Sequence, residues 1–451
     1  MESGLVLHWE VSIPVLAMKI LSLTAGAARM YCGSCLRDNA LAAELVRQGH
    51  DVRLQPLYTP TRTDEPNVSQ SLVFLNGISV CLDQQAAFFR RPHRLLDRLW
   101  DAPWMLKLAS RTSIAVDPHQ LGAMTVSMLR GEEGFQLKEI RKLTDWLRSL
   151  EPPNIVVLPN SLLSGLARPI RGALNRPVCC TFQGEELFLG QMPESYRAQS
   201  LDLIRANAAS IDGFVAVSRY SAAYWTQRLG LPEAETRVVP LGINLDGYPT
   251  CRPAPAGGPY RIGFLARIAP EKGLHLLAEG YRRLRRDPGF SPSVLEAAGY
   301  LAPEHRGYLH TIEREMKDAG LAREFRYHGE LDRARKIEFL HRLDVLSVPA
   351  VCDEPKGIPL LEAMAAEVPV VQPRRGAFVE ILEQTGGGLL INLDDPDALA
   401  EGIRRLRRDP ALAAALARAG AHSVRERFTV AHMAGHALEA YRSIAALAAH
   451  A

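Results

Sequence analysis

Short apolar or β-branched segments alternate with helical patterns along this chain, and no other feature constrains its fold as strongly. The clearest helical pattern is RDNALAAELVRQGHDV, in which apolar residues recur on one face and Gly49 stands at the C-terminal end. Alternation of this kind is typical of β-α units on a parallel sheet. The first series of predicted strands comprises residues 19–24, 51–57, 154–159, 177–182, 213–218 and 237–242.

A Pro- and Gly-rich stretch, PTCRPAPAGGP, separates this series from a second one. It lacks apolar periodicity and is interpreted as a linker. The second series of predicted strands comprises residues 260–267, 293–299, 324–329, 345–350, 369–374 and 387–392. We therefore predict an α/β fold with two Rossmann-like β/α/β domains that face each other across a cleft, where ligands bind at the carboxyl ends of the strands. The predicted units are an N-terminal extension at 1–17, an N-terminal domain at 18–248, the linker at 249–259, a C-terminal domain at 260–425 and a C-terminal helix at 426–451.

The composition excludes several classes of protein. Of the 451 residues, 47% are hydrophobic and 23% are charged, which argues against a disordered or fibrous chain. The formal charge of +3 gives no indication of a nucleic-acid partner. The odd count of seven cysteines argues against a secreted disulfide framework. Because the N-terminus lacks a basic signal region and no apolar run is long enough to span a bilayer, we expect a cytoplasmic protein, with peripheral contact to the inner face of the membrane as the alternative.

The most informative stretch is DEPKGIPLLEAMAAEVPVV at residues 353–371, directly after a predicted strand. Pro359 suits the first turn of a helix, so we expect a helix that begins near Ile358 and carries Glu362, with Glu354 on the preceding loop. A loop-to-helix junction of this kind offers backbone N–H groups and a positive dipole end to a phosphate. The alternative is an ordinary helix with an acidic first turn.

A second stretch, FLARIAPEKG, places two cations near the end of another predicted strand. Arg267 and Lys272 could together neutralise a diphosphate, Arg by its planar fork and Lys as a point charge. The alternative is a solvated loop. Cations and carboxylates at the mouth of one cleft favour the first interpretation.

These stretches, together with VAVSRYSAAYWTQRLG, VVPLGINLDGY and YCGSCLRDNALAAELVRQGHDV, resemble glycosyltransferase family 4, the retaining, nucleotide-sugar-dependent enzymes of the GT-B fold. The resemblance covers residues 18 to about 440. It implies that Arg267 and Lys272 bind the donor diphosphate, that Glu362 binds the ribose hydroxyls, and that Glu354 contacts the transferred sugar near its anomeric carbon. It also implies that Gly357 and Ile358 offer backbone N–H groups, and that the loop with Gly33 and Ser34 faces the donor phosphates and the acceptor.

The resemblance further implies a hexosyltransferase that moves a sugar from a nucleoside-diphosphate sugar to a carbohydrate or lipid-linked acceptor with retention. Neither a dedicated nucleophile nor a metal is expected, because fixed protein cations can stabilise the leaving diphosphate. The C-terminal helix at 426–451 is expected to pack back on the N-terminal domain. The alternatives are a GT-B 2-epimerase and a protein that binds nucleotide sugars without transferring them.

The chain departs from the family pattern at three positions. Lys356 stands where an aromatic residue is common, and is either an extra phosphate-binding cation or a solvent-facing side chain. Glu367 replaces a turn Gly and would be strained at positive φ. Gln183 stands where many members have a catalytic His that serves the donor sugar; Gln can hydrogen-bond sugar hydroxyls but does not titrate.

Three further motifs have competing interpretations. Cys32 and Cys35 form a C-x-x-C pair, which is either a redox pair at a helix N-terminus or a shielded pair of thiols. The DPD sequence at 395–397 imitates a metal-binding signature, but helix capping explains it better. Residues 86–111 combine aromatic and basic side chains. This segment is either a helical insert packed on the N-terminal domain or a border of the acceptor site that contacts an anionic membrane.

Overall fold

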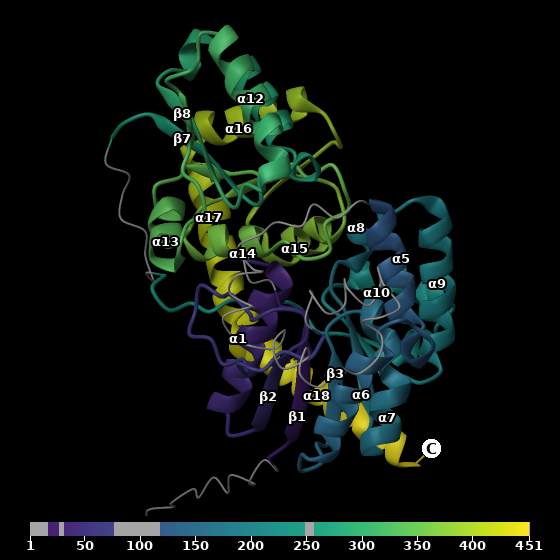
Figure 1. The fold of residues 1–451 in the computed structure, drawn as a ribbon. Helices are drawn as coiled ribbons and strands as arrows, with labels where there is room; N and C mark the ends of the chain where they lie inside the picture. Colours follow the sequence, from purple (N-terminus) through teal and green to yellow (C-terminus); the bar gives the residue numbers. More distant parts are fainter. Residues whose placement is uncertain (1–16, 27–30, 76–117, 249–256, 451) are drawn as a thin grey trace, which may run out of the picture.

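The computed structural model describes residues 17–26, 31–75, 118–248 and 257–450. Within these ranges, two six-stranded parallel sheets confirm the predicted pair of Rossmann-like α/β domains (Figure 1). The predictions for the segment 86–111, for nearly all of the extension 1–17 and for most of the linker 249–259 lie outside the described residues.

The N-terminal sheet has the strand order β2-β1-β3-β4-β5-β6. Its central strands are buried along their whole length, because helices cover both faces of a parallel sheet. The strands are β1 (Lys19–Thr24), β2 (Asp51–Pro56), β3 (Ile155–Leu158), β4 (Val178–Phe182), β5 (Gly213–Ala216) and β6 (Thr236–Val238). The helices are α1 (Gly33–Arg47), α5 (Pro118–Leu129), α6 (Leu137–Arg148), α7 (Ala167–Leu174), α8 (Glu185–Gly190), α9 (Glu194–Ala208) and α10 (Arg219–Leu229).

The C-terminal sheet has the order β12-β11-β10-β7-β8-β9, so the strand order reverses between β7 and β10. Ligands of such sheets bind at the carboxyl ends of the strands beside this reversal. The strands are β7 (Tyr260–Leu265), β8 (Ser293–Ala298), β9 (Phe325–Tyr327), β10 (Val345–Leu346), β11 (Val370–Pro373) and β12 (Gly388–Ile391). The helices are α11 (Leu274–Leu284), α12 (Arg306–Asp318), α13 (Arg333–His341), α14 (Ile358–Ala365), α15 (Ala377–Thr385), α16 (Pro396–Arg408) and α17 (Pro410–Arg427).

The last helix, α18 (Val430–His450), continues from α17 out of the C-terminal domain and lies against the N-terminal sheet (Figure 1). Its buried side chains Met433, Tyr441 and Ile444 pack on residues of β1, β3 and β5. A Cβ on Gly213 of β5 would lie 2.7 Å from Cγ1 of Ile444, so the missing side chain permits this close approach. The two domains are therefore joined both by the linker and by this returning helix.

The turn after α14 contains Glu367 at a φ of 55°. The backbone N–H of Glu367 donates to the carbonyl of Met364, and that of Val368 donates to Ala363. Left-handed backbone favours Gly, so the expected strain at this departure from the family pattern is present.

Candidate functional site

A cavity of about 520 Å³ lies between the two domains, within the size range of sites that bind small molecules. All nine residues predicted from the sequence line it, at the carboxyl ends of both sheets: Gly33, Ser34, Gln183, Arg267, Lys272, Glu354, Gly357, Ile358 and Glu362. On the C-terminal side, the loops after β7 and β10 flank the reversal of strand order. Residues that are far apart in the sequence thus line one cleft.

Lys272 and Glu354 form an ion pair inside this cavity. Both side chains are nearly buried, with 12% and 10% of their surfaces exposed. Burial raises the pKa of Glu354, but the charge and hydrogen bond of Lys272, together with the charge of Lys356, outweigh burial and hold that pKa below its ordinary value. The loops that carry the pair are also joined, because the backbone N–H of Val351 donates to the Glu271 carbonyl over 3.0 Å. Glu354 is therefore an anion whose partner cation could move to a phosphate.

Arg267 lies at the edge of the same cavity and is more exposed than Lys272. Its Nη2 is 3.1 Å from Oε1 of Glu271, and 43% of its side chain is exposed. Exposed pairs of this type hold their geometry weakly. The guanidinium can therefore exchange Glu271 for an anionic ligand at small cost.

Helix α14 begins at Ile358, as the sequence predicts, with Gly357 as its N-cap at a φ of 75°. Glu362 lies on the second turn of this helix and is buried. Because Pro359 occupies the first turn, its missing N–H breaks no helical hydrogen bond. The helix N-terminus and Glu362 thus line the same cavity.

Lys356 points to the N-terminal domain. Its Nζ donates to Oγ of Ser34 over 2.8 Å, and its side chain is half-buried. The interpretation of Lys356 as a solvent-facing residue is therefore wrong, and the lysine joins the two walls of the cleft. Ser34 belongs to the first turn of α1, where backbone N–H groups point outward.

Gln183 follows β4 and has only 2% of its surface exposed. Its Nε2 donates to the Pro159 carbonyl over 2.7 Å and to Oδ1 of Asp38 over 3.3 Å. Its Oε1 is buried and has no hydrogen-bond partner among the described residues. A buried acceptor without a partner is costly, so this oxygen is a candidate acceptor for a sugar hydroxyl.

The C-x-x-C pair opens helix α1, with Cys32 as the N-cap. A hydrogen bond from Cys35 and the charge of Lys356 lower the pKa of Cys32, whereas the same bond and burial raise the pKa of Cys35. Neither thiol forms a disulfide in the structure. The redox interpretation stays a prediction, and replacing both cysteines with Ser without loss of activity would dismiss it.

The DPD motif caps helix α16. Oδ1 of Asp395 accepts hydrogen bonds from the backbone N–H groups of Asp397 and Ala398 over 2.9 and 3.0 Å. Capping is therefore the correct interpretation of this sequence. Within the part of the chain that the structure describes, no group of three His, Cys, Asp or Glu side chains is arranged to hold a metal ion, and no helix is long and apolar enough to cross a membrane.

Glu186, beside the cavity wall, carries a prediction about pH. Burial and the negative charge of Glu185 raise its pKa from an ordinary value of 4.5 to about 7. The folded state then binds this proton more tightly than the unfolded state, so the free energy of unfolding falls as pH rises through that window. Glu186→Gln keeps an acceptor for Nε1 of Trp225 but carries no charge at any pH. The free energy of unfolding of the variant minus that of wild type should therefore be up to about 3 kcal/mol larger at about pH 8 than at about pH 4.5. Urea unfolding across this range tests it; parallel pH profiles for the two proteins would contradict it.

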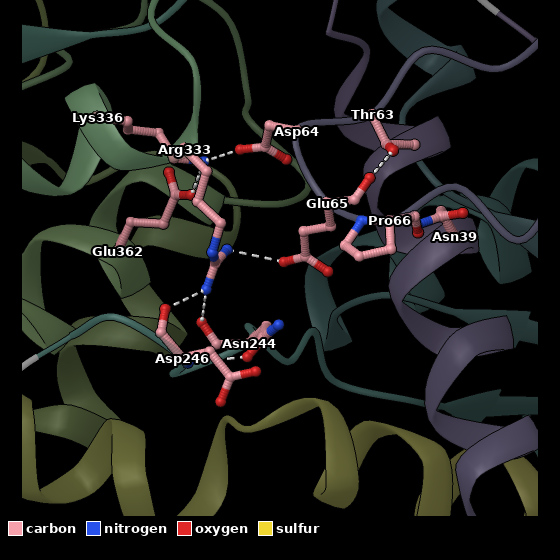
Figure 2. Close-up of polar contacts among 10 residues, drawn as sticks. All are labelled: Asn39, Thr63, Asp64, Glu65, Pro66, Asn244, Asp246, Arg333, Lys336 and Glu362. Carbon is pink, nitrogen blue, oxygen red and sulfur yellow. Dashed lines mark hydrogen bonds and ion pairs between the residues drawn. The ribbon is translucent and has the colours of Figure 1, made fainter.

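Sequence reasoning missed a cluster of charges at one end of the cavity (Figure 2). Nζ of Lys336, on α13, lies 2.5 Å from Oε1 of Glu362 and 2.5 Å from Oδ2 of Asp64, which belongs to the N-terminal domain. Burial lowers the pKa of Lys336, but the two carboxylates outweigh it and raise that pKa. No spacing in the sequence joins these residues.

Two families of known proteins match adjoining parts of the chain. The family described as glycosyl transferase 4-like domain matches residues 39–242, and the family described as glycosyl transferases group 1 matches residues 252–423. These two matches cover the two sheets with nearly all of their strands.

Curated relatives and solved structures agree with this assignment. The chain is 30% identical over 240 residues to a phosphatidyl-myo-inositol mannosyltransferase of Mycobacterium leprae, covering 52% of this chain and 60% of that protein, which is less than two thirds of its length. It is 27% identical over 322 residues to a glycogen synthase of Mycobacterium tuberculosis, covering 68% of this chain and 73% of that protein.

Among solved structures, HepE of Anabaena in complex with UDP and glucose has a TM-score of 0.67 at 16% identity, covering 94% of this chain and 100% of that one. Sucrose-phosphate synthase of Thermosynechococcus elongatus has a TM-score of 0.70 at 18% identity, covering 95% and 99%. These likenesses show a shared fold. Since the family matches extend over both domains, the chain belongs to glycosyltransferase family 4, the group 1 glycosyltransferases.

Proposed function

We propose that this protein transfers a hexose from a nucleoside-diphosphate sugar to a carbohydrate or lipid-linked acceptor with retention at the anomeric carbon. The observation that carries the proposal is the interdomain cavity in which Arg267 and Lys272 lie beside Glu354 at the reversal of strand order. Cations at this position suit a diphosphate, and the adjacent carboxylate suits sugar hydroxyls.

The chemistry follows from the charges that develop during transfer. Departure of the nucleoside diphosphate leaves negative charge on the phosphate and positive charge on the sugar. In our proposal Lys272 exchanges Glu354 for the leaving phosphate, and Glu354 then accepts hydrogen bonds from the sugar. The phosphate helps to deprotonate the acceptor on the same face of the sugar, so positioning supplies much of the rate enhancement. The cations of the protein take the role that a metal has in other transferases.

The N-terminal wall is the proposed acceptor side. It contributes Gly33, Ser34 and Gln183 to the cavity, and the unpartnered Oε1 of Gln183 can accept from a hydroxyl of donor or acceptor. The relatives named above include a phosphatidyl-myo-inositol mannosyltransferase and a glycogen synthase, which supports an acceptor that is either lipid-linked or a carbohydrate.

A thermal-shift screen over UDP, GDP and ADP sugars, in buffer with EDTA, tests the proposal. A donor at about 100 times its dissociation constant should stabilise the protein by about 2.7 kcal/mol. Arg267→Ala should weaken binding of that donor roughly tenfold to a hundredfold, because a charge-assisted hydrogen bond is lost. Arg314→Ala, on the exposed face of α12, is the matched control and should bind as wild type.

Assays of product separate the alternatives. Transfer to an acceptor or to water with a retained anomer, read by NMR, supports the transferase. Donor binding without turnover favours a silent binding protein, and inversion at C2 of the donor sugar favours a 2-epimerase. No shift with any sugar nucleotide would overturn the proposal.

A further inference from the structure

A short irregular segment of the N-terminal domain, residues 61–68, reaches across the cleft to α13; we call it the strap. Three of its charged side chains form ion pairs with the C-terminal domain. Arg62 lies 3.0 Å from Glu330, Asp64 lies 2.5 Å from Lys336, and Glu65 lies 2.8 Å from Arg333. The strap thus presents one cation and two anions, and each lies against a partner of opposite charge.

The N-terminal domain holds the strap in shape. The side chain of Asn39, on α1, donates to the Pro66 carbonyl over 3.0 Å and accepts from the backbone N–H of Val68 over 3.0 Å. Within the strap, Nδ2 of Asn67 donates to the Thr61 carbonyl over 2.9 Å. Asn39 is buried, so these hydrogen bonds attach the strap to the N-terminal domain.

Its partners on the C-terminal side are also arranged in register. Glu330, Arg333 and Lys336 are three residues apart and lie along one side of α13 and the segment before it. Arg333 also donates to the carbonyls of Asn244 and Asp246 over 3.0 and 2.7 Å, just before the linker (Figure 2). Helix α13 therefore contacts the N-terminal domain at several points.

Lys336 connects this contact to the cavity. Only 8% of its surface is exposed, and its ammonium is shared between Asp64 of the strap and Glu362 of α14. A lysine ammonium has three donors, whereas a carboxylate has about four acceptor sites, so Glu362 can accept from Lys336 and from a ligand at once. Buried charges that lose a partner are strongly disfavoured, so the position of Lys336 depends on both carboxylates.

We propose that Lys336 is a positioning residue for Glu362, and that Asp64 fixes it in place only when the two domains are closed. This inference rests on the proposed function and on the role that the family resemblance implies for Glu362, which is to bind the ribose of the donor. Recognition of the nucleoside part of the donor then requires a residue of the opposite domain, whereas recognition of the diphosphate by Arg267 and Lys272 does not. Closure of the cleft and ribose binding are thereby coupled.

The test compares a nucleoside diphosphate with inorganic pyrophosphate, which lacks the ribose. Binding of UDP, GDP, ADP and pyrophosphate is measured by calorimetry for the full chain and for Asp64→Asn, which is nearly isosteric. We expect the variant to bind the preferred nucleoside diphosphate about tenfold more weakly and to bind pyrophosphate as wild type. Lys336→Met should show the same selective loss, and combining the two substitutions should add little to it.

Glu65→Gln is the matched control, because it removes the same charge from the adjacent residue but leaves Lys336 paired. Its ratio of nucleoside diphosphate to pyrophosphate affinity should fall much less than that of Asp64→Asn, because Glu65 joins the two domains but does not hold Lys336. Equal weakening of both ligands by Asp64→Asn, or no weakening of either, overturns this inference alone. Absence of nucleoside diphosphate binding in the unaltered protein overturns the proposed function as well, and so the two failures are distinguishable. Thermal unfolding of each variant identifies any that fails to fold. If one does, Lys336→Arg replaces it, because arginine keeps the charge but changes its geometry. Lys336→Arg should show the selective loss of nucleoside diphosphate binding, and the absence of that loss overturns the inference.

Discussion

Replacing Lys272 with alanine is expected to lower kcat/KM for the donor by about 100-fold to 1,000-fold, the size of effect seen when one fixed donor to a developing negative charge is removed. Two consequences combine in this variant. The leaving phosphate loses a cation, and buried Glu354 loses its ion-pair partner. Because the charge of Lys272 holds down the pKa of Glu354, that pKa should rise in the variant. Steady-state kinetics with the preferred donor measure the loss.

Two further variants serve as controls. Lys272→Arg retains the charge and should recover part of the activity, limited by the different shape of the guanidinium. Lys317→Ala, at an exposed position near the end of α12, should match wild type in both activity and stability within about 0.5 kcal/mol. A Lys272→Ala enzyme that stays within about threefold of wild type would mean that Lys272 does not meet the phosphate.

The second large effect is expected on stability, from Gly273→Ala. Gly273 has a φ of 77°, and a Cβ there would lie 1.9 Å from the carbonyl oxygen of Pro349, which belongs to the segment before Glu354. Left-handed backbone costs a residue with a Cβ about 1–2 kcal/mol, and relief of the clash adds roughly 1–3 kcal/mol. We expect a loss of about 2 to 5 kcal/mol and a lower thermal midpoint by roughly 5 to 15 °C. Because the clash separates the loops of Lys272 and Glu354, donor binding should fall as well.

Gly435→Ala provides the matched control with the opposite sign. Gly435 lies inside α18, and a Cβ there would meet nothing within 4 Å. Alanine should therefore stabilise the protein by about 0.5–1 kcal/mol through helix propensity. Calorimetric or circular-dichroism melting of both variants is the measurement. Equal and small shifts for the two glycines would contradict the geometric argument at Gly273.

The fold could be predicted in detail because its signals are local. Buried parallel strands appear in the sequence as short apolar runs, and the helices between them as amphipathic or capped segments. Pro359 marked the start of α14 near the correct residue. The residues expected in the cleft all line one cavity, because the carboxyl ends of parallel strands meet at one edge of each sheet.

The pairing of charges across the cleft could not be predicted. Asp64 and Lys336 are 272 residues apart and lie on an irregular segment and a helix of opposite domains. Nothing in the periodicity of either segment marks them as partners, since long-range contacts follow from the way two domains dock. The role of Lys356 was open for the same reason: its contact with Ser34 crosses the cleft.

The return of α18 to the N-terminal sheet also has a consequence for the order in which the protein forms during translation. Ile20, Val157 and Val215 are made early, but the helix that covers them is made after the whole C-terminal domain. At a synthesis rate of about 5–20 residues per second, α18 is completed on the order of 10 s or more after the strands that it covers. A nascent chain that stops at the linker would contain every strand of the first sheet and α1, yet the part of one face that α18 covers would be exposed and prone to aggregation.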